Sequence, residues 1–139
     1  MWVVGADLLA APFAAAGFDA VMVDAPCTAT GTLARHPEAR GRITPRAIAA
    51  LVARQRGLLD AAAALVRPGG VLVYATCSLE PEENVEQVDA FLERHPRFAR
   101  APVPGAVSAV LLTAAGDYLA LPPRDAMDGA YAARLVRRG

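Results

Sequence analysis

The apolar positions of the chain fall into short runs and into longer stretches with helical spacing. Residues 18–23 (FDAVMV) and 71–75 (VLVYA) are short apolar runs that stop at polar loop residues, a pattern typical of buried strands. Residues 118–121 and 130–136 alternate enough to predict two final strands. Residues 110–113 fit either a strand or a helical turn. Strands therefore account for several short segments in both halves of the chain.

Helical spacing occupies the segments between the first strands. Apolar residues recur every three or four positions after Thr44-Pro45, which supplies a helix cap and a proline at the first helical position. Arg67-Pro68-Gly69-Gly70 stops this helix. A second helix is expected from Pro81 to His95, and residues 2–4 fit a clipped strand. The alternation of strands and helices predicts an α/β fold with a mostly parallel sheet.

The length and charge of the chain narrow the possible functions. Its 139 residues suit one domain, and 55% of them are hydrophobic, which is enough for a packed core. Fourteen arginines balance fourteen acids, so the whole chain lacks the basic excess that marks many nucleic-acid-binding proteins. Charge is uneven, because residues 35–56 hold six arginines and one acid, whereas residues 80–93 hold six acids and no base. Positive charge is therefore concentrated in residues 35–56 and negative charge in residues 80–93.

Neither targeting nor membrane insertion is indicated by the apolar stretch at residues 8–18. It is too short to span a bilayer, lacks a positively charged flank and is interrupted by Pro12 and Gly17. The two cysteines of the chain make neither a disulfide scaffold nor a zinc site, which needs about four ligands at short spacings. We therefore expect a cytoplasmic protein with reduced thiols, no membrane partner and no metal.

The two cysteines, Cys27 and Cys77, each follow the end of a predicted strand. In open α/β sheets, ligands bind beyond the carboxyl ends of the strands, so both thiols point into one crevice if the two strands are neighbours. The alternative is that each is a small buried hydrophobe. A helix start after Cys77 favours its thiolate, although nearby acids oppose this. Asp24, three residues before Cys27, is either a hydrogen-bond acceptor in the crevice or a turn residue.

Three longer motifs contain these residues. They are residues 24–37 (DAPCTATGTLARHP), 69–92 (GGVLVYATCSLEPEENVEQVDAFL) and 127–138 (MDGAYAARLVRR). In content and order they resemble the motifs of the RsmB/Nop/Sun family of RNA (cytosine-5) methyltransferases. The resemblance covers nearly the whole chain. It implies a Rossmann-like, S-adenosylmethionine-dependent methyltransferase fold whose terminal strand is antiparallel.

The resemblance also implies roles for single residues. Cytosine C5 is a poor nucleophile, and a thiolate that adds to C6 makes C5 able to attack the methyl group of S-adenosylmethionine. By resemblance, Cys77 is this nucleophile and Cys27 assists breakdown of the adduct. Asp24 corresponds to a residue that contacts the cytosine ring edge and lies near the cofactor. Asp7 corresponds to an aspartate that contacts the adenosine of the cofactor.

The substrate implied by the resemblance is RNA. The variant TAT at residues 28–30 and the segment AGDYLALPP at residues 115–123 favour the bacterial branch that modifies small-subunit ribosomal RNA. Four arginines would face the RNA backbone if their segment borders the crevice. They are Arg35, Arg40, Arg42 and Arg46. The alternative for each of them is an ordinary solvated surface position.

The chain departs from the family in its cofactor-binding elements. The family's glycine-rich loop and the acid that holds the ribose are not found in these 139 residues, nor is an N-terminal RNA-binding region. Residues 1–139 are therefore interpreted as the C-terminal part of a catalytic domain. We expect the isolated chain to have little or no activity, and a complementing N-terminal half is a possible partner.

Two other functions stay open. DNA cytosine-5 methyltransferases use a Pro-Cys nucleophile and a Glu-Asn-Val motif, which Pro26-Cys27 and residues 83–85 imitate, so Cys27 would then be the attacking residue. Alternatively, the chain is a non-catalytic remnant that binds RNA or a partner through an exposed sheet edge.

Overall fold

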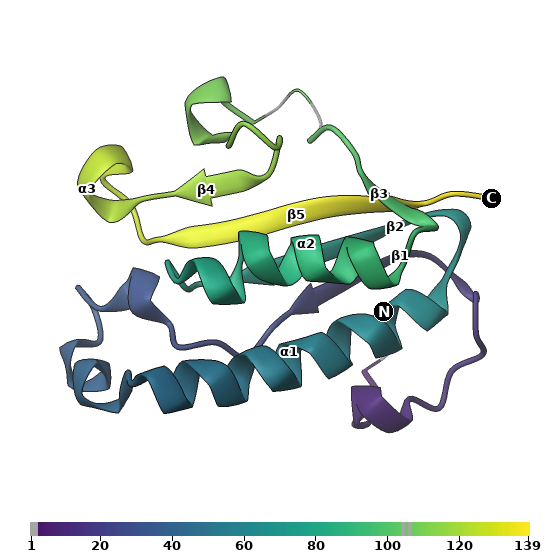
Figure 1. Cartoon of the computed structure of the whole chain (residues 1–139), viewed down its shortest axis with the longest axis horizontal. Helices are drawn as coiled ribbons and strands as arrows, with labels where there is room; N and C mark the ends of the chain where they lie inside the picture. The colour runs from purple at the N-terminus through teal and green to yellow at the C-terminus, as the bar shows by residue number, and fades with distance from the viewer. Residues whose placement is uncertain (1–2, 104, 106) are drawn as a thin grey trace.

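A computed structural model describes residues 3–103, 105 and 107–139. It is an α/β fold in which two helices lie side by side along one sheet (Figure 1). The helices are α1 (Pro45–Leu65), α2 (Val85–Arg94) and the short α3 (Pro122–Asp125), and five 3₁₀ turns, η1 to η5, occupy the connections. The strands are β1 (Phe18–Asp24), β2 (Val66–Thr76), β3 (Phe98–Arg100), β4 (Tyr118–Ala120) and β5 (Ala130–Arg137). No helix formed by the described residues is long and apolar enough to cross a membrane.

The sheet contains one strand that runs against all the others. Its order is β1-β2-β5-β3, and β4 also pairs with β5. β1 and β2 are parallel, whereas β5 is antiparallel to β2, β3 and β4. Four strands therefore share one direction and the terminal strand opposes them, which confirms the predicted α/β class with a mostly parallel sheet.

The parallel pairing of β1 with β2 brings two loops together. Asp24 lies opposite Ala75, and the Ala25 amide donates to the Ala75 carbonyl oxygen over 2.9 Å. Both strands therefore end at the same level. The segments that follow them, which carry the two cysteines, leave the sheet side by side.

The second strand is longer than the sequence pattern predicts. β2 begins at Val66 rather than Val71 and includes Pro68 and Gly69, the latter with φ of 76°. Val66 pairs with Phe18, and the register shifts before Ala20. A proline and glycines are tolerated here because the irregular stretch lies at the start of the strand.

Two other short segments differ from or refine the predictions. Residues 110–113 were open to a strand or a helical turn, and the turn η5 (Ala109–Leu111) is found. The predicted strand at residues 2–4 is not found at Val3 and Val4, which are exposed and irregular, and its first residue lies outside the described residues. A strand needs a neighbouring strand to satisfy its backbone groups, and none pairs with Val3 or Val4.

One buried cluster joins the helices to the sheet. Leu59 of α1 and Phe91 of α2 are fully buried with Leu72 and Tyr74 of β2. Each buried side chain of this size contributes roughly 1.5–3 kcal/mol. The alternating burial along β2 places Leu72 and Tyr74 on the helix-covered face. Met22 on β1, in contrast, is 67% exposed on the opposite face.

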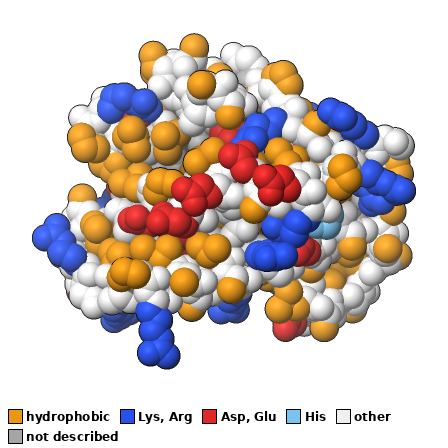
Figure 2. Space-filling view, in the orientation of Figure 1, with side chains coloured by type: hydrophobic (Ala, Val, Ile, Leu, Met, Phe, Trp, Pro, Cys, Tyr) orange, Lys and Arg blue, Asp and Glu red, His pale blue; other side chains and the backbone are white. Residues whose placement is uncertain are grey.

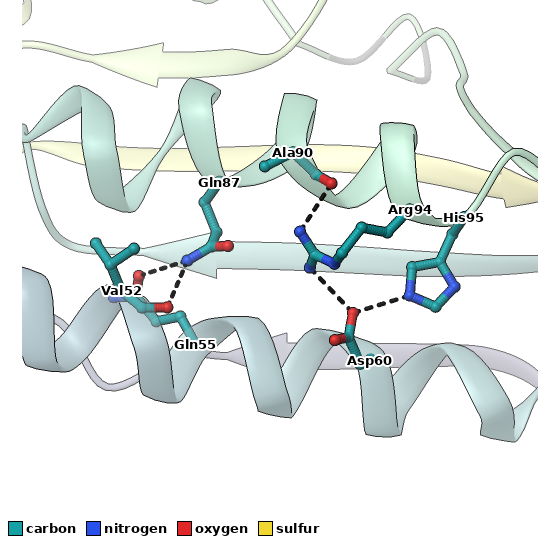
Figure 3. Close-up of polar contacts among 7 residues, drawn as sticks. All are labelled: Val52, Gln55, Asp60, Gln87, Ala90, Arg94 and His95. Carbon is teal, nitrogen blue, oxygen red and sulfur yellow. Dashed lines mark hydrogen bonds and ion pairs between the residues drawn. The ribbon is translucent and has the colours of Figure 1, made fainter.

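An ion-pair cluster joins α1 to α2 near the C-terminal ends of both helices (Figure 3). The Asp60 carboxylate accepts from Arg94 Nη2 over 3.0 Å and contacts His95 Nε2 over 2.8 Å. Burial acts to raise the pKa of Asp60, but the hydrogen bonds and charges of His95 and Arg94 outweigh it and lower the pKa below its usual value. A group with a lowered pKa stabilises the folded state above its ordinary pKa, and this stability is lost as pH falls through the folded-state pKa.

We expect Asp60→Asn to lower the free energy of unfolding by about 1 kcal/mol at pH 7, because the pair is partly exposed. The difference between variant and wild type should vanish at acidic pH, where Asp60 is protonated. Urea denaturation at both pH values measures it, with Glu93→Gln, an exposed acid on α2, as the control. An equal difference at both pH values would contradict the ionic explanation.

Candidate active site

The two cysteines lie in contact beyond the carboxyl ends of β1 and β2. Cys27 Sγ is 3.4 Å from Cys77 Sγ, and both residues are half-buried. Burial raises the pKa of the Cys27 thiol to about 12, and the neighbouring Cys77 contributes to this rise. Cys27 is therefore a neutral thiol near pH 7. The structure thus brings together the two thiols that the sequence placed at separate strand ends.

Backbone hydrogen bonds hold the two cysteine-bearing segments against each other. The Gly31 amide donates to the Cys77 carbonyl oxygen over 2.9 Å, and the Gly129 amide donates to the Gly31 carbonyl oxygen over 2.8 Å. Gly31 is buried, and a Cβ at this position would lie 2.7 Å from Gly129 Cα. Three segments far apart in sequence therefore cross at a point where only glycine fits.

Buried hydroxyl groups add a second set of contacts. Ser78 Oγ lies 3.1 Å from Thr28 Oγ1 and 3.3 Å from Thr30 Oγ1. Thr30 Oγ1 also accepts from the Leu79 amide over 2.8 Å, and Ser78 Oγ accepts from the Glu80 amide over 3.0 Å. The residues that immediately follow each cysteine are thus fixed by short polar side chains.

Asn84 fixes the segment around Cys77 from the other side. Its Oδ1 accepts from Thr76 Oγ1 over 2.6 Å, and its Nδ2 donates to the Ser78 carbonyl oxygen over 2.8 Å. The side chain therefore bridges the residue before Cys77 and the residue after it. Sequence reasoning noted Asn84 within a motif but gave it no role.

Glu83 is a fully buried carboxylate beneath the Cys27 loop. It accepts from the backbone amide of Thr28 and from its hydroxyl group. Gln55 Nε2 donates to the Glu83 carboxylate and to the Pro26 carbonyl oxygen, each over 2.9 Å. Sequence reasoning placed Glu83 within the predicted helix that starts at Pro81 and gave it no role of its own. The polar character of the residue does not reveal its burial.

A pocket with a volume of about 360 Å³ adjoins Cys27, within the size range of small-molecule sites. Its wall is formed by Cys27, Thr28, Ala29, Ala39, Arg42, Ile43, Ala47 and Leu51. One of the four predicted RNA-binding arginines, Arg42, therefore borders the cysteine site.

The other predicted arginines lie nearby in sequence and on the surface. Arg35 pairs with Asp128 over 3.1 Å, Arg40 lies in η3 (Pro37–Arg42), and Arg46 lies in the first turn of α1. All four arginines are exposed. Figure 2 shows that acids instead occupy the centre of the helix-covered face, where α2 and η4 lie. The arginines of residues 35–46 and the acids of α2 therefore belong to different segments of the fold.

The two predicted aspartates occupy different places. Asp24 is the last residue of β1 and is exposed next to the cysteine loops. Asp7 caps η1 (Leu8–Ala10), where its Oδ1 accepts from the Leu9 amide over 3.0 Å. Figure 1 shows the purple η1 segment beside the C-terminal half of α1, away from the tip of β1. The described residues therefore do not bring Asp7 next to the cysteines.

Comparison with known proteins decides the family. The family model described as 16S rRNA methyltransferase RsmB/F matches residues 1–136. The chain belongs to this family. Among RsmB/F relatives, the ribosomal RNA small subunit methyltransferase B of Thermus thermophilus is 46% identical over 117 residues, which cover 84% of this chain and 29% of that protein.

Solved structures of similar proteins share the fold of this RsmB/F chain. The crystal structure of PH0851 matches with a TM-score of 0.76 and 40% identity, covering 84% of this chain and 26% of that one. NSun6 from Pyrococcus horikoshii, solved with SFG, matches with a TM-score of 0.72 and 28% identity, covering 85% of this chain and 29% of that one. The chain thus spans less than a third of the length of these relatives.

Proposed function

We propose that this chain carries the catalytic cysteines of an enzyme that methylates C5 of cytosine in RNA with S-adenosylmethionine as methyl donor. Small-subunit ribosomal RNA is the favoured substrate, in line with the name of the Thermus thermophilus relative. The observation that carries the proposal is the 3.4 Å contact between Cys27 Sγ and Cys77 Sγ at the ends of two parallel strands.

The proposed reaction divides the work between the two thiols. The Cys77 thiolate adds to C6 of cytosine, and C5 then attacks the methyl group, with S-adenosylhomocysteine as the leaving group. A water molecule takes the C5 proton, and cleavage of the C6–sulfur bond returns its electron pair to Cys77 and releases the product. A neutral Cys27 thiol can donate a hydrogen bond to the departing Cys77 sulfur, which assists this last step.

The pKa of Cys27 also bears on the competing DNA methyltransferase mechanism, in which Cys27 attacks. The thiolate is the nucleophilic form of cysteine, and burial raises the pKa of Cys27 to about 12. Little thiolate would therefore be present at Cys27 near neutral pH. The proposal of Cys77 as the nucleophile rests on the motif around it at residues 76–84, which resembles that of the RNA (cytosine-5) methyltransferases.

The residues present offer acceptors suited to the cofactor and donors suited to RNA. The Asp24 carboxylate, beside the cysteine loops, can accept hydrogen bonds from amine and hydroxyl groups of S-adenosylmethionine, which supplies an electrophilic methyl group when bound. Asp7, which lies away from the cysteines in this chain, would bind the adenosine only in the enzyme assembled with its N-terminal half. A structural neighbour was solved with SFG, an analogue of this cofactor. Asp24 would also bind the edge of the cytosine ring. Arg35, Arg40, Arg42 and Arg46 would contact phosphates.

The open edge of the sheet suggests how the remaining cofactor-binding elements attach. β1 pairs with β2 on one side, and no described residue pairs with its other edge. Met22 and Phe18 on this strand are 67% and 37% exposed. Apolar side chains on an unpaired strand mark a surface that another chain segment covers. The proposal therefore includes a complementing N-terminal half seated against β1.

Covalent trapping tests the proposal. The chain is co-expressed with the part of the Thermus thermophilus relative that precedes the matched segment, and is incubated with S-adenosylmethionine and RNA containing 5-fluorocytidine. The fluorine blocks loss of the C5 substituent, so we expect a stable adduct that peptide mapping assigns to Cys77. The chain alone should form at most a trace of it. Labelling at Cys27, or adduct with DNA but not RNA, would contradict the proposed function.

A further inference from the structure

The Cys27 loop rests on one buried carboxylate. Glu83 is completely buried, and its carboxylate oxygens accept the hydrogen bonds that it makes. Its partners are the Thr28 amide and hydroxyl groups and Gln55 Nε2. Thr28 is the residue directly after Cys27, so the carboxylate holds the loop at a point adjacent to the thiol.

Gln55 reaches the other side of the same loop. Its Nε2 also donates to the carbonyl oxygen of Pro26, the residue directly before Cys27, over 2.9 Å. Cys27 therefore lies between two anchored neighbours, and both anchors meet at the Glu83 carboxylate. Buried carboxylates in a low-dielectric interior bind such donors strongly.

The orientation of Gln55 is itself fixed by the contact between the two long helices (Figure 3). Gln87 Nε2, on α2, donates to the Val52 carbonyl oxygen over 2.8 Å and lies 3.4 Å from Gln55 Oε1. Because Gln87 occupies the acceptor oxygen of Gln55, the amide nitrogen of Gln55 points to Glu83 and Pro26. Hydrogen bonds thus connect α2 through α1 to the Cys27 loop.

The main chain of Glu83 also holds the strand that leads to Cys77. Tyr74 donates its hydroxyl hydrogen to the Glu83 carbonyl oxygen over 2.7 Å, and Tyr74 lies three residues before Cys77 in β2. Glu83 therefore contacts both cysteine-bearing segments, through its side chain on one and its main chain on the other.

We propose that Glu83 is a positioning residue whose buried carboxylate fixes the Cys27 loop and so sets the contact between the Cys27 and Cys77 thiols. This inference deepens the proposed function and rests on it for the role of Cys27. Glu83 itself does not touch the reacting atoms. Its loss should release Cys27 while leaving Cys77 in place, because Asn84 and Ser78 hold the Cys77 segment independently.

The first test measures the thiol contact directly in the 139-residue chain and needs no activity. The chain has two cysteines, so oxidised glutathione can convert this thiol pair to one disulfide, releasing two reduced glutathione molecules. The equilibrium yields an effective concentration of one thiol at the other. We expect Glu83→Ala to lower it about 10-fold. Glu82→Ala, at an exposed neighbouring position, should leave it unchanged.

Two further variants separate positioning from general damage. Glu83→Gln retains a carbonyl oxygen for the Thr28 and Gln55 donors, so it should restore most of the effective concentration. Thr28→Val removes one donor to Glu83 without removing the carboxylate, and should give a smaller loss if Glu83→Ala fails to fold. A folded Glu83→Ala chain with wild-type thiol coupling, or wild-type chain that forms no disulfide, would overturn the proposal.

The second test uses the co-expressed enzyme and ordinary RNA. If Glu83 acts by placing Cys27, Glu83→Ala should accumulate covalent RNA adduct, as is expected of Cys27→Ala, whereas general loss of the site would abolish the adduct. Adduct in Cys27→Ala but not in folded Glu83→Ala would overturn the positioning role alone. Absence of adduct in Cys27→Ala would instead count against the proposed function. The glutathione experiment would still show whether Glu83 sets the contact between the two thiols.

Discussion

Cys77→Ala is expected to lower methyl transfer by at least ~10⁴-fold and to abolish the covalent RNA adduct in the co-expressed enzyme. Without the Cys77 sulfur, no nucleophile adds to C6, and C5 stays unreactive. Cys27 is not expected to replace it, because the proposed mechanism gives Cys27 the role of a donor to the departing sulfur and burial acts to raise the pKa of its thiol. Methyl transfer from labelled S-adenosylmethionine and denaturing gels measure the two effects.

Cys27→Ala is the matched variant for this prediction. It should slow turnover by about 10²-fold or more while the adduct accumulates, because bond formation at Cys77 persists and its breakdown is impaired. The two sulfur atoms are 3.4 Å apart, so a cytosine C6 atom near one is also near the other, and the two variants distinguish which sulfur attacks. Adduct in Cys77→Ala and none in Cys27→Ala would assign the attack to Cys27 and favour the DNA-type mechanism.

Gly31→Ala is expected to lower the free energy of unfolding by about 3 kcal/mol, the upper part of the range for overpacked sites. The new methyl group would meet backbone atoms of Gly129, with Gly129 C and Cα at 2.7 Å. Backbone cannot rotate aside as a side chain can, so either the loop of Cys27 or that before β5 must move. Urea denaturation followed by circular dichroism measures the loss.

Gly41→Ala is the control for the glycine prediction. A Cβ there meets no atom within 4 Å, so the substitution should be neutral or slightly stabilising through a less flexible unfolded chain. Equal stability of Gly31→Ala and Gly41→Ala would show that the crossing of the three segments is looser than described. The same Gly31→Ala chain should also lose thiol coupling, since the Gly31 amide binds the Cys77 carbonyl oxygen.

The sequence predicted the elements whose signals are local. The start of α1 at Thr44-Pro45 is confirmed, because the cap and the proline act within one turn, and Thr44 Oγ1 accepts from the Ala47 amide. The strand before Cys27 is confirmed from its run of β-forming residues. The convergence of Cys27 and Cys77 followed from one topological rule, that neighbouring parallel strands end at the same edge.

Some features that depend on distant partners were not predicted. β3 has three residues and exists because it pairs with β5, more than thirty residues later. Pro68 and Gly69 have the composition of a helix stop, yet Val66 beside them pairs with Phe18. The burial of Glu83 at the site likewise depends on residues that are distant in sequence. A glutamate at a helix start is usually solvated, and only donors from Thr28 and Gln55 make its burial favourable.

The terminal strand has a consequence for how the chain is made. β5 occupies residues 130–137, and β2, β3 and β4 all pair with it. Neither β3 nor β4 can join the sheet until residues 130–137 have left the ribosome. The preceding part of the chain therefore stays partly folded during synthesis. A chain truncated before Ala130 would therefore lack the strand that joins β2 to β3 and β4, and such a product is suited to degradation rather than to weak activity.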